Sequence, residues 1–320
     1  MPTRAPKPTR NRSKLSILHA QNLEKLPWLV HGFSTRTGGF SRAYAKGDLN
    51  LGFTKDDAKA TVDRNRAAFL SALKATGARH TKRNDKDSNK SGRSKLVTLR
   101  QVHSDIIHHV DSHHVDSHQV GSEPDAPLTG DGLITATPGL LLAIQTADCL
   151  PIILVDAKRR AVGVFHAGWR GTVKRIVEKG VGEMHRWFGT RPKDIKAAIG
   201  PGIGGCCYEV GEEVRTKFES QFSYAAKLFR EVKDSDPVHE KYPLLFLTAR
   251  APGHGELPPK IFLDLAEANR RQLLSVGVPA NSIEASPMCT SCRTDLLFSY
   301  RAEKAKTGRM IAVAGIRARS

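Results

Sequence analysis

Three side chains suited to metal ligation or nucleophilic catalysis stand at the ends of strand-like segments. His103 follows the alternating run KLVTLRQV, Cys149 lies in the polar TADC break between two apolar runs, and His166 ends AVGVFH. Side chains at strand ends meet at one rim of a sheet. Two imidazoles and one thiolate suit zinc, and three protein ligands leave a fourth tetrahedral position for water or substrate. Ordinary packing of each side chain is the alternative.

The segment HAGWRGT predicts a strand-to-helix turn beside His166. Gly168 and Gly171 permit close approach of the backbone, and a helix N-terminus offers free N–H groups and a positive dipole. Arg170 adds a planar guanidinium that can hold phosphate through two hydrogen bonds. We therefore expect an anion site here, against the alternative of an ordinary turn with a solvated arginine.

The other cysteines form no complete metal-binding motif in the sequence. Cys206 and Cys207 follow a Gly-rich segment, and we predict that they pack in the interior. Cys289 and Cys292 have CxxC spacing, but no second CxxC and no paired histidines complete a four-ligand set. Five cysteines are too few, and odd in number, for a disulfide scaffold, so a reducing cytoplasm is expected.

The elements that must position these residues form a mixed pattern. Strands and helices alternate without a regular βαβ order, and no linker separates two halves, which predicts a single mixed α/β, α+β-like domain. Residues 232–260 are Pro-rich and polar, as expected of a long loop. Strands are predicted at 17–23, 96–104, 140–146, 150–156, 161–166, 195–200, 296–300 and 310–316, and helices at 56–76, 172–188, 209–219 and 262–278.

Most of the formal charge of +18 lies in a few segments. Residues 1–14 and residues 79–95 each carry five net positive charges, and Arg317 and Arg319 add two. We interpret residues 1–14 as a basic disordered tail and 15–320 as one catalytic domain with flexible insertions at about 79–95 and 108–127. No nucleic-acid-reading motif accompanies the charge, so no specific nucleic-acid partner is expected.

The second insertion begins with a short tandem repeat, HHVDS-HHVDS-HQVGS, over residues 108–122. We interpret it as a surface loop whose five histidines lie outside the active site. The longest apolar run, near 140–144, falls far short of the roughly 20 residues that span a bilayer. No secretory signal is evident either, so no membrane partner is expected.

The chain strongly resembles the laccase-domain, YfiH-like family of purine nucleoside phosphorylases, long labelled polyphenol oxidases. The resemblance covers roughly residues 28–317, and the TADCLP and HAGWRGT blocks are highly specific. The motifs that carry it occur in this order: HGFSTRTGGFS, LNLG, QVHS, GDGLIT, LAIQTADCLPIILVD, VGVFHAGWRGT, AAIGPGIGGCCYEVGEEV, SPMCTSC and FSYR…TGRMIAVAGI.

The resemblance implies one α/β domain of sandwiched mixed β-sheets flanked by helices. It implies one zinc ion bound by His103, Cys149 and His166. It also implies cleavage of adenosine, inosine and methylthioadenosine with inorganic phosphate, together with deamination of adenosine. Some members are linked instead to editing of a peptidoglycan precursor.

The residue pattern and the resemblance together suggest roles for three further residues. Arg170 is a candidate for the phosphate site, and Arg36, in the STR block, for an anionic or ribose contact. Asp148 is a candidate to orient a zinc ligand or to move a proton. The oligomeric state is not indicated.

Three other functions compete with this interpretation. A multicopper oxidase needs many H-x-H pairs, and the sequence contains none. A cysteine hydrolase would use Cys149 as a thiolate nucleophile for amide cleavage, as in precursor editing. A basic nucleic-acid-binding protein is the second alternative.

Overall fold

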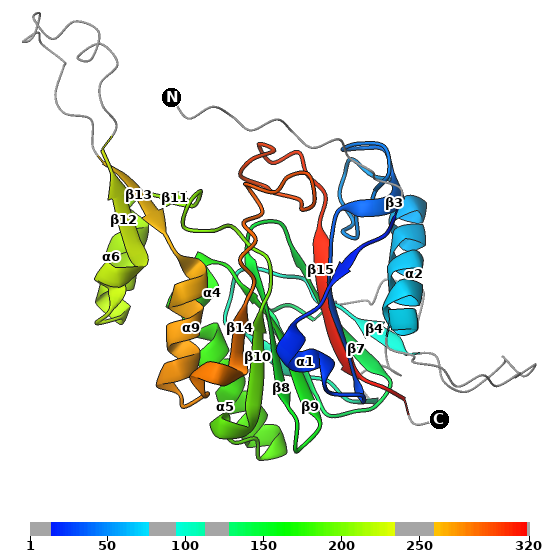
Figure 1. Ribbon diagram of the computed structural model, residues 1–320, viewed down its shortest axis with the longest axis horizontal. Coiled ribbons are helices and arrows are strands. Elements are labelled where there is room, and N and C mark those ends of the chain that lie inside the picture. Colours follow the sequence, from blue (N-terminus) through cyan, green and yellow to red (C-terminus); the bar gives the residue numbers. More distant parts are fainter. Residues whose placement is uncertain (1–13, 77–93, 113–127, 234–258, 319–320) are drawn as a thin grey trace, which may run out of the picture.

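The computed structural model describes residues 14–76, 94–112, 128–233 and 259–318. Within them two large mixed sheets and one small sheet form the framework (Figure 1). The five-stranded sheet has the order β1 (Ile17–Leu18), β2 (Leu29–Ser34), β15 (Met310–Ile316), β7 (Leu140–Thr146) and β4 (Lys95–Val97). The six-stranded sheet has the order β14 (Ile283–Ala285), β10 (Ile195–Ile199), β8 (Leu150–Asp156), β9 (Ala161–Ala167), β6 (Gly132–Thr135) and β5 (Ile107–His109).

The remaining elements flank these two sheets. The small sheet has the order β11 (Glu209–Val210), β13 (Lys260–Leu263) and β12 (Phe229–Val232), and β3 spans Thr37–Ser41. The helices are α1 (Gln21–Glu24), α2 (Lys59–Thr76), α4 (Trp169–Val173), α5 (Ile176–Phe188), α6 (Glu212–Gln221) and α9 (Leu265–Ser275). None of the helices in the described ranges is long and apolar enough to cross a membrane.

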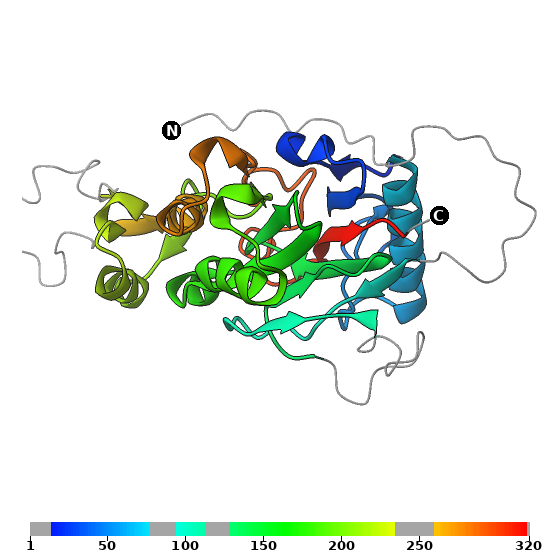
Figure 2. The same ribbon diagram turned by 90° about the horizontal axis from the view of Figure 1, so that it is seen from below.

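Strand β8 shows why the sheets stack. Its side chains alternate between two apolar surroundings, since successive residues of a strand point to opposite faces. Ile153 and Val155 pack between the two large sheets, while Ile152 and Leu154 pack in the core with α5 and α9. Phe69 and others of α2 cover the outer face of the five-stranded sheet. The order of layers is therefore helix, sheet, sheet, helix (Figures 1 and 2). The expected sandwich of mixed sheets flanked by helices is confirmed.

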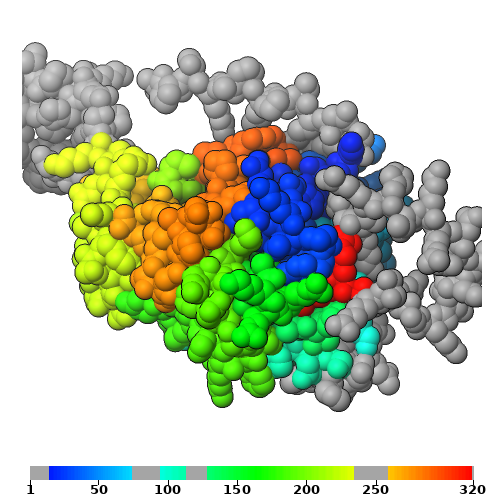
Figure 3. Space-filling view, turned by 60° about the horizontal axis from the view of Figure 1, so that its bottom comes forward, coloured from blue at the N-terminus to red at the C-terminus, as the bar shows by residue number. Residues whose placement is uncertain are grey.

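The N-terminal segment closes one edge of the sandwich. The Glu284 carboxylate accepts hydrogen bonds from the amides of Gln21 and Asn22, and the Asn22 amide group donates to the carbonyls of Ala197 and Ser282. Figure 3 shows this blue segment against the orange and green parts of the chain. The capped amides explain why the strand predicted at 17–23 ends at residue 18 and is followed by helix α1.

Several other predicted boundaries were wrong for local reasons. The helix predicted over 172–188 breaks at Arg175, which has the left-handed φ of 63°. The helix predicted from residue 262 begins at Leu265, because Phe262 belongs to β13 and Asp264 caps the helix through the Glu267 amide. Residues 296–300 form turns, not the predicted strand.

The first predicted insertion, 79–95, ends in strand β4, and the second, 108–127, begins in strand β5. Lys95 belongs to β4, where it pairs with Leu140 of β7. Residues 107–109 form β5 beside β6, and Val110 of the first HHVDS unit is buried in the core, so the insertion predicted from residue 108 starts too early. The tail at 1–13, residues 77–93 and the repeat from 113 onward lie outside the described residues.

The chain passes from one large sheet to the other through the TADC segment. Strand β7 ends at Thr146 in the five-stranded sheet, and β8 begins at Leu150 in the six-stranded sheet. Asp148 adopts a φ of 96°, a conformation that few non-glycine residues adopt. This crossing places Cys149 at the rim where the two sheets meet.

Arg36, which is predicted to contact an anion or a ribose, lies in a buried ion-pair network. Its guanidinium bonds both oxygens of Asp48, at 2.7 and 3.3 Å, and Glu303 at 2.8 Å. A further bond to the Thr294 carbonyl and the ring of Phe298 complete its surroundings. Its side chain is 2% exposed. These contacts use the guanidinium to hold three loops together.

We predict that Arg36→Met destabilises the protein by about 3–5 kcal/mol, because it removes the guanidinium that pairs with the buried Asp48 carboxylate and with Glu303. Urea denaturation measures the change in the free energy of unfolding. Arg42→Met, at an exposed arginine nearby, is the control and should change it by less than about 0.5 kcal/mol. A normally stable Arg36→Met protein with a raised KM for substrate would restore the expected substrate contact.

Candidate metal centre

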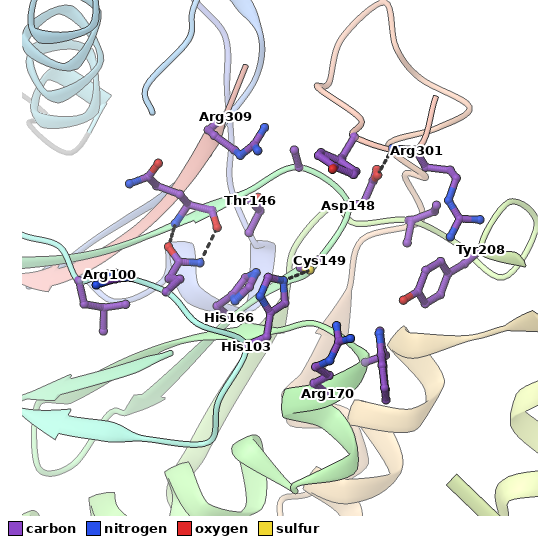
Figure 4. A pocket seen from close by; sticks show the side chains of 17 residues that line it. Arg100, His103, Thr146, Asp148, Cys149, His166, Arg170, Tyr208, Arg301 and Arg309 are labelled. Carbon is purple, nitrogen blue, oxygen red and sulfur yellow. Dashed lines mark hydrogen bonds between the residues drawn. The ribbon is translucent and has the colours of Figure 1, made fainter. Parts of the chain in front are cut away.

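The structure brings the three predicted ligands together. One ligand atom each from His103, Cys149 and His166 lies within 4.8 Å of the other two. The Cys149 Sγ is 3.8 Å from the His103 Nε2, and the two imidazole rings meet edge to face with centroids 4.9 Å apart. Figure 4 shows the trio in the middle of the side chains drawn.

Each ligand comes from a different kind of position in the sandwich. His166 lies inside the buried strand β9, opposite Pro151 of β8. Cys149 ends the crossing between the sheets. His103 lies in the loop after β4 and has a φ of 57°. The two strands fix two of the ligands, whereas the His103 loop needs support from elsewhere.

The Asp131 carboxylate supplies that support. Its Oδ1 lies 2.8 Å from the His166 Nδ1 and accepts the His103 amide at 3.1 Å. Its Oδ2 accepts the Ser104 amide at 2.5 Å, the Ser104 hydroxyl at 2.7 Å and the Val102 amide at 3.2 Å. Asp131 is fully buried. One carboxylate thus holds the His103 loop and orients the His166 ring.

Asp131 is not among the site residues predicted from the sequence. In GDGLIT it stands between two glycines before a strand, where an aspartate is usual in a turn. One general rule could have pointed to such a residue: a metal-bound histidine commonly donates its other ring N–H to a carboxylate. That rule predicts an acidic partner for His166 or His103 but does not say which of the acidic residues it is.

The buried charges favour a thiolate beside an imidazolium when no metal is bound. Burial opposes both charges, but His166 and His103 lower the pKa of Cys149 to about 6. Burial likewise opposes the charge on His166, yet Cys149 and Asp131 raise the pKa of His166 to about 9. Burial also opposes ionisation of Asp131, but hydrogen bonds from His166 and Ser104 lower its pKa to about 2. Asp131 is therefore ionised at every physiological pH.

The arrangement fits a divalent metal ion. With Nδ1–H of His166 donated to Asp131, its Nε2 is the atom available to the ion. Gly168 keeps the space open, since a Cβ there would lie 2.8 Å from the Cys149 Sγ and 3.1 Å from the His103 Cδ2. Two imidazole nitrogens and one thiolate leave a fourth coordination position, and all three ligands line the same cavity.

That cavity has a volume of about 640 Å³ and is rich in arginine. Within the described part of the chain, none of its arginines pairs with a carboxylate, so their charge is available to an anionic ligand. Figure 4 shows Arg170 and Tyr208 on one side of the trio and Arg100 on the other. Its arginines and aromatic residues are Arg100, Arg170, Arg301, Arg309, Trp169, Tyr208 and Tyr300.

Asp148 lines the cavity but is not part of the ligand trio. Its Oδ1 accepts the hydroxyls of Thr290, at 2.6 Å, and Ser299, at 2.7 Å. Its Oδ2 accepts the Arg301 amide at 2.6 Å. The carboxylate thus ties the 290–301 segment to the sheet crossing next to Cys149.

The other cysteines differ from their predicted environment. Cys206 is exposed and Cys207 only partly buried, so the prediction that both pack in the interior was wrong. Both lie on a turn that faces Cys289 and Cys292, and the four thiols form a second cluster. The adjacent Cys206 and Cys207 therefore join the CxxC pair of Cys289 and Cys292 in one group of four thiols, although the sequence has no second CxxC motif.

This chain belongs to the family described as multi-copper polyphenol oxidoreductase laccase, whose model matches residues 30–317. The family expected from the motifs is thereby confirmed.

Curated relatives cover almost the whole chain. A purine nucleoside phosphorylase from Deinococcus radiodurans is 35% identical over 306 residues, which are 94% of this chain and 93% of the relative. A protein named adenosine deaminase, from an unknown prokaryotic organism, is 34% identical over 90% of this chain and 96% of its own length. The crystal structure of a hypothetical YfiH protein from Bacillus licheniformis superposes with a TM-score of 0.75 at 30% identity, covering 96% of this chain and 99% of that chain.

We predict that Asp131→Asn weakens metal binding by about 10- to 100-fold, because His166 loses its charged partner and the His103 loop its strongest acceptor. Competition with a chromophoric chelator measures the dissociation constant. The matched control is Asp156→Asn, at a buried aspartate that accepts the Lys158 and Arg159 amides at the far end of β8. Equal metal affinities for the two variants would contradict the role given to Asp131.

Proposed function

We propose that the protein is a zinc-dependent purine nucleoside phosphorylase that also deaminates adenosine. The observation that carries the proposal is the ligand trio facing a cavity that is lined by arginines and aromatic rings. The names of the relatives from Deinococcus radiodurans and the unknown prokaryote support it. Five free cysteines agree with a reducing cytoplasm as its location.

Substrate binding would use the two kinds of side chain that line the cavity. A purine ring stacks on aromatic faces such as those of Trp169 and Tyr208, and inorganic phosphate requires cationic hydrogen-bond donors. Burial, together with the nearby Cys149 thiolate, raises the pKa of Tyr208. Its phenol is then protonated at neutral pH and can donate a hydrogen bond to the substrate.

Arg170 is the first candidate for the phosphate contact. Its guanidinium lies 4.4 Å from the centre of the Trp169 ring, and the Lys217 ammonium is 5.3 Å from the same ring. Helix α4 has only five residues, so its dipole adds little and the side-chain charge carries the argument. Arg170 would hold phosphate against C1′ of the sugar during phosphorolysis.

His103, Cys149 and His166 would hold the zinc ion. The chemistry that such an ion supplies is Lewis acidity, which lowers the pKa of water toward about 7 and suits hydrolytic deamination at the purine C6. The chain's own contribution is to orient the three donors. Asp131 does this for His166 by holding its Nδ1–H, so that the lone pair of Nε2 faces the ion.

A cysteine-dependent hydrolase that edits a peptidoglycan precursor is the second candidate. The specific observation in its favour is the lowered pKa of Cys149 beside the raised pKa of His166, which is the charge pattern of an activated thiolate. The same thiolate cannot serve as zinc ligand and as free nucleophile at once. The third interpretation, a nucleic-acid-binding protein, rests on residues 1–14 and 79–95, nearly all outside the described part of the chain.

We predict two different products from adenosine. With phosphate, chromatography should show adenine and ribose 1-phosphate, since phosphate attacks C1′ and the base leaves. Without phosphate it should show inosine only, since water replaces the C6 amino group. Incubation with a chelator followed by zinc should abolish and restore both activities.

The variant Cys149→Ser tests the alternative function of a cysteine-dependent hydrolase. Loss of zinc together with activity supports the ligand role. An enzyme that stays fully active after its zinc has been removed, and loses activity only on Cys149→Ser, would support the nucleophile instead.

We also predict that Arg170→Ala raises the KM for phosphate by about 10- to 100-fold, because a charge-assisted hydrogen bond contributes ~1.5–3 kcal/mol. Deamination in phosphate-free buffer should persist. Arg186→Ala, at an exposed arginine of α5, is the control and should leave both activities unchanged. An unaltered phosphate KM in Arg170→Ala would remove Arg170 from the phosphate site.

A further inference from the structure

Four cysteine thiols meet at one point next to the cavity. The Sγ atoms of Cys206, Cys207, Cys289 and Cys292 all lie within 4.8 Å of one another. The Cys292 Sγ is 3.6 Å from that of Cys206 and 3.4 Å from that of Cys207. Their exposure ranges from the buried Cys289 to the exposed Cys206 and Cys292, so an ion from solvent can reach them.

Two turns hold the thiols in place from opposite sides. In the first, the amides of Cys207 and Tyr208 donate to the Gly204 carbonyl at 2.9 and 3.0 Å. In the second, the Arg293 amide donates to the Cys289 carbonyl at 3.0 Å. The Gly204 amide crosses between them and donates to the Cys289 Sγ at 3.2 Å. An amide that donates to sulfur stabilises a thiolate, which is the form that binds a metal.

The sulfur spacing distinguishes a single metal ion from other uses of four cysteines. Zn–S bonds of about 2.3 Å at tetrahedral angles separate the sulfurs by about 3.8 Å, close to the observed spacing. A disulfide needs a sulfur–sulfur distance of about 2.05 Å. In an iron–sulfur cluster the thiolates bind different irons and stand further apart across the cluster.

We propose that Cys206, Cys207, Cys289 and Cys292 form a second metal site, a mononuclear tetrathiolate zinc site. Four protein ligands leave no open coordination position, so the site is structural and not catalytic. The ion links the turn at 204–208 to the turn at 289–293, in addition to the backbone bridge between Gly202 and Cys289.

The linked turns form part of the cavity wall. Tyr208, which lines the cavity, directly follows Cys207. Thr290, which directly follows Cys289, donates to the Asp148 carboxylate beside Cys149. A zinc ion here therefore fixes the distance between the aromatic wall and the first metal centre, and its loss loosens substrate binding. The site stands whether or not the proposed function is correct, because it rests on the thiols alone.

The experiment measures zinc per chain by mass spectrometry in protein purified under reducing conditions. The wild type should hold two zinc ions. Cys149→Ser and Cys292→Ser should each hold one, and the double variant none. Ser291→Ala, within the same turn, is the matched control and should hold two. One zinc in the wild type that Cys292→Ser retains would overturn the proposal.

Cobalt binding distinguishes a site of four thiolates from a site of two imidazoles and one thiolate. This experiment does not require that Cys292→Ser folds. The variant Cys149→Ser leaves the four cysteines untouched. After a chelator has removed its zinc, added Co²⁺ should produce the intense sulfur-to-cobalt charge-transfer absorption of a tetrathiolate site. Thiol titration of the same protein should show four thiols protected until a chelator is added. Absence of that absorption, four freely reactive thiols, a disulfide among them, or iron in place of zinc would each refute the assignment.

Discussion

The candidate metal centre depends on the hydrogen bonds that the buried Asp131 carboxylate accepts. This carboxylate joins two ligands that come from unrelated parts of the fold, one inside a strand and one on a loop. A carboxylate can do this because its two oxygens offer several acceptor positions, and here protein donors occupy them. Without it, the ordering of the His103 loop and the tautomer of His166 would have to be set at the moment of metal binding.

The position of the centre follows from how the chain joins the two sheets. The TADC segment leaves one sheet and enters the other, so the thiolate lies at their junction. His166 lies one strand further into the second sheet, and the antiparallel pairing of β8 with β9 fixes the separation of the two ligands. Arg170 comes from helix α4, and the other arginines of the cavity come from the loops around this rim, where substrate contacts can differ between relatives without a change in the core.

Much of this arrangement can be predicted from local sequence. The buried strands β7, β8 and β9 are apolar runs because both of their faces are covered, and the polar residues at their ends mark the site. Contacts between distant residues could not be predicted. In its motif Arg36 resembled a ligand contact. Its partner Glu303 stands 267 positions further along the chain, so the local sequence holds no sign of their ion pair. Cys206 and Cys292 are 86 positions apart, which hides their common site from any spacing rule.

His103 and Cys149 both lie in segments that cross from the five-stranded sheet to the six-stranded sheet, the first between β4 and β5 and the second between β7 and β8. The centre therefore depends on the packing of the two layers against each other. Heating that separates the layers should move both side chains away from His166, so that metal affinity would report how much of the sandwich is still folded.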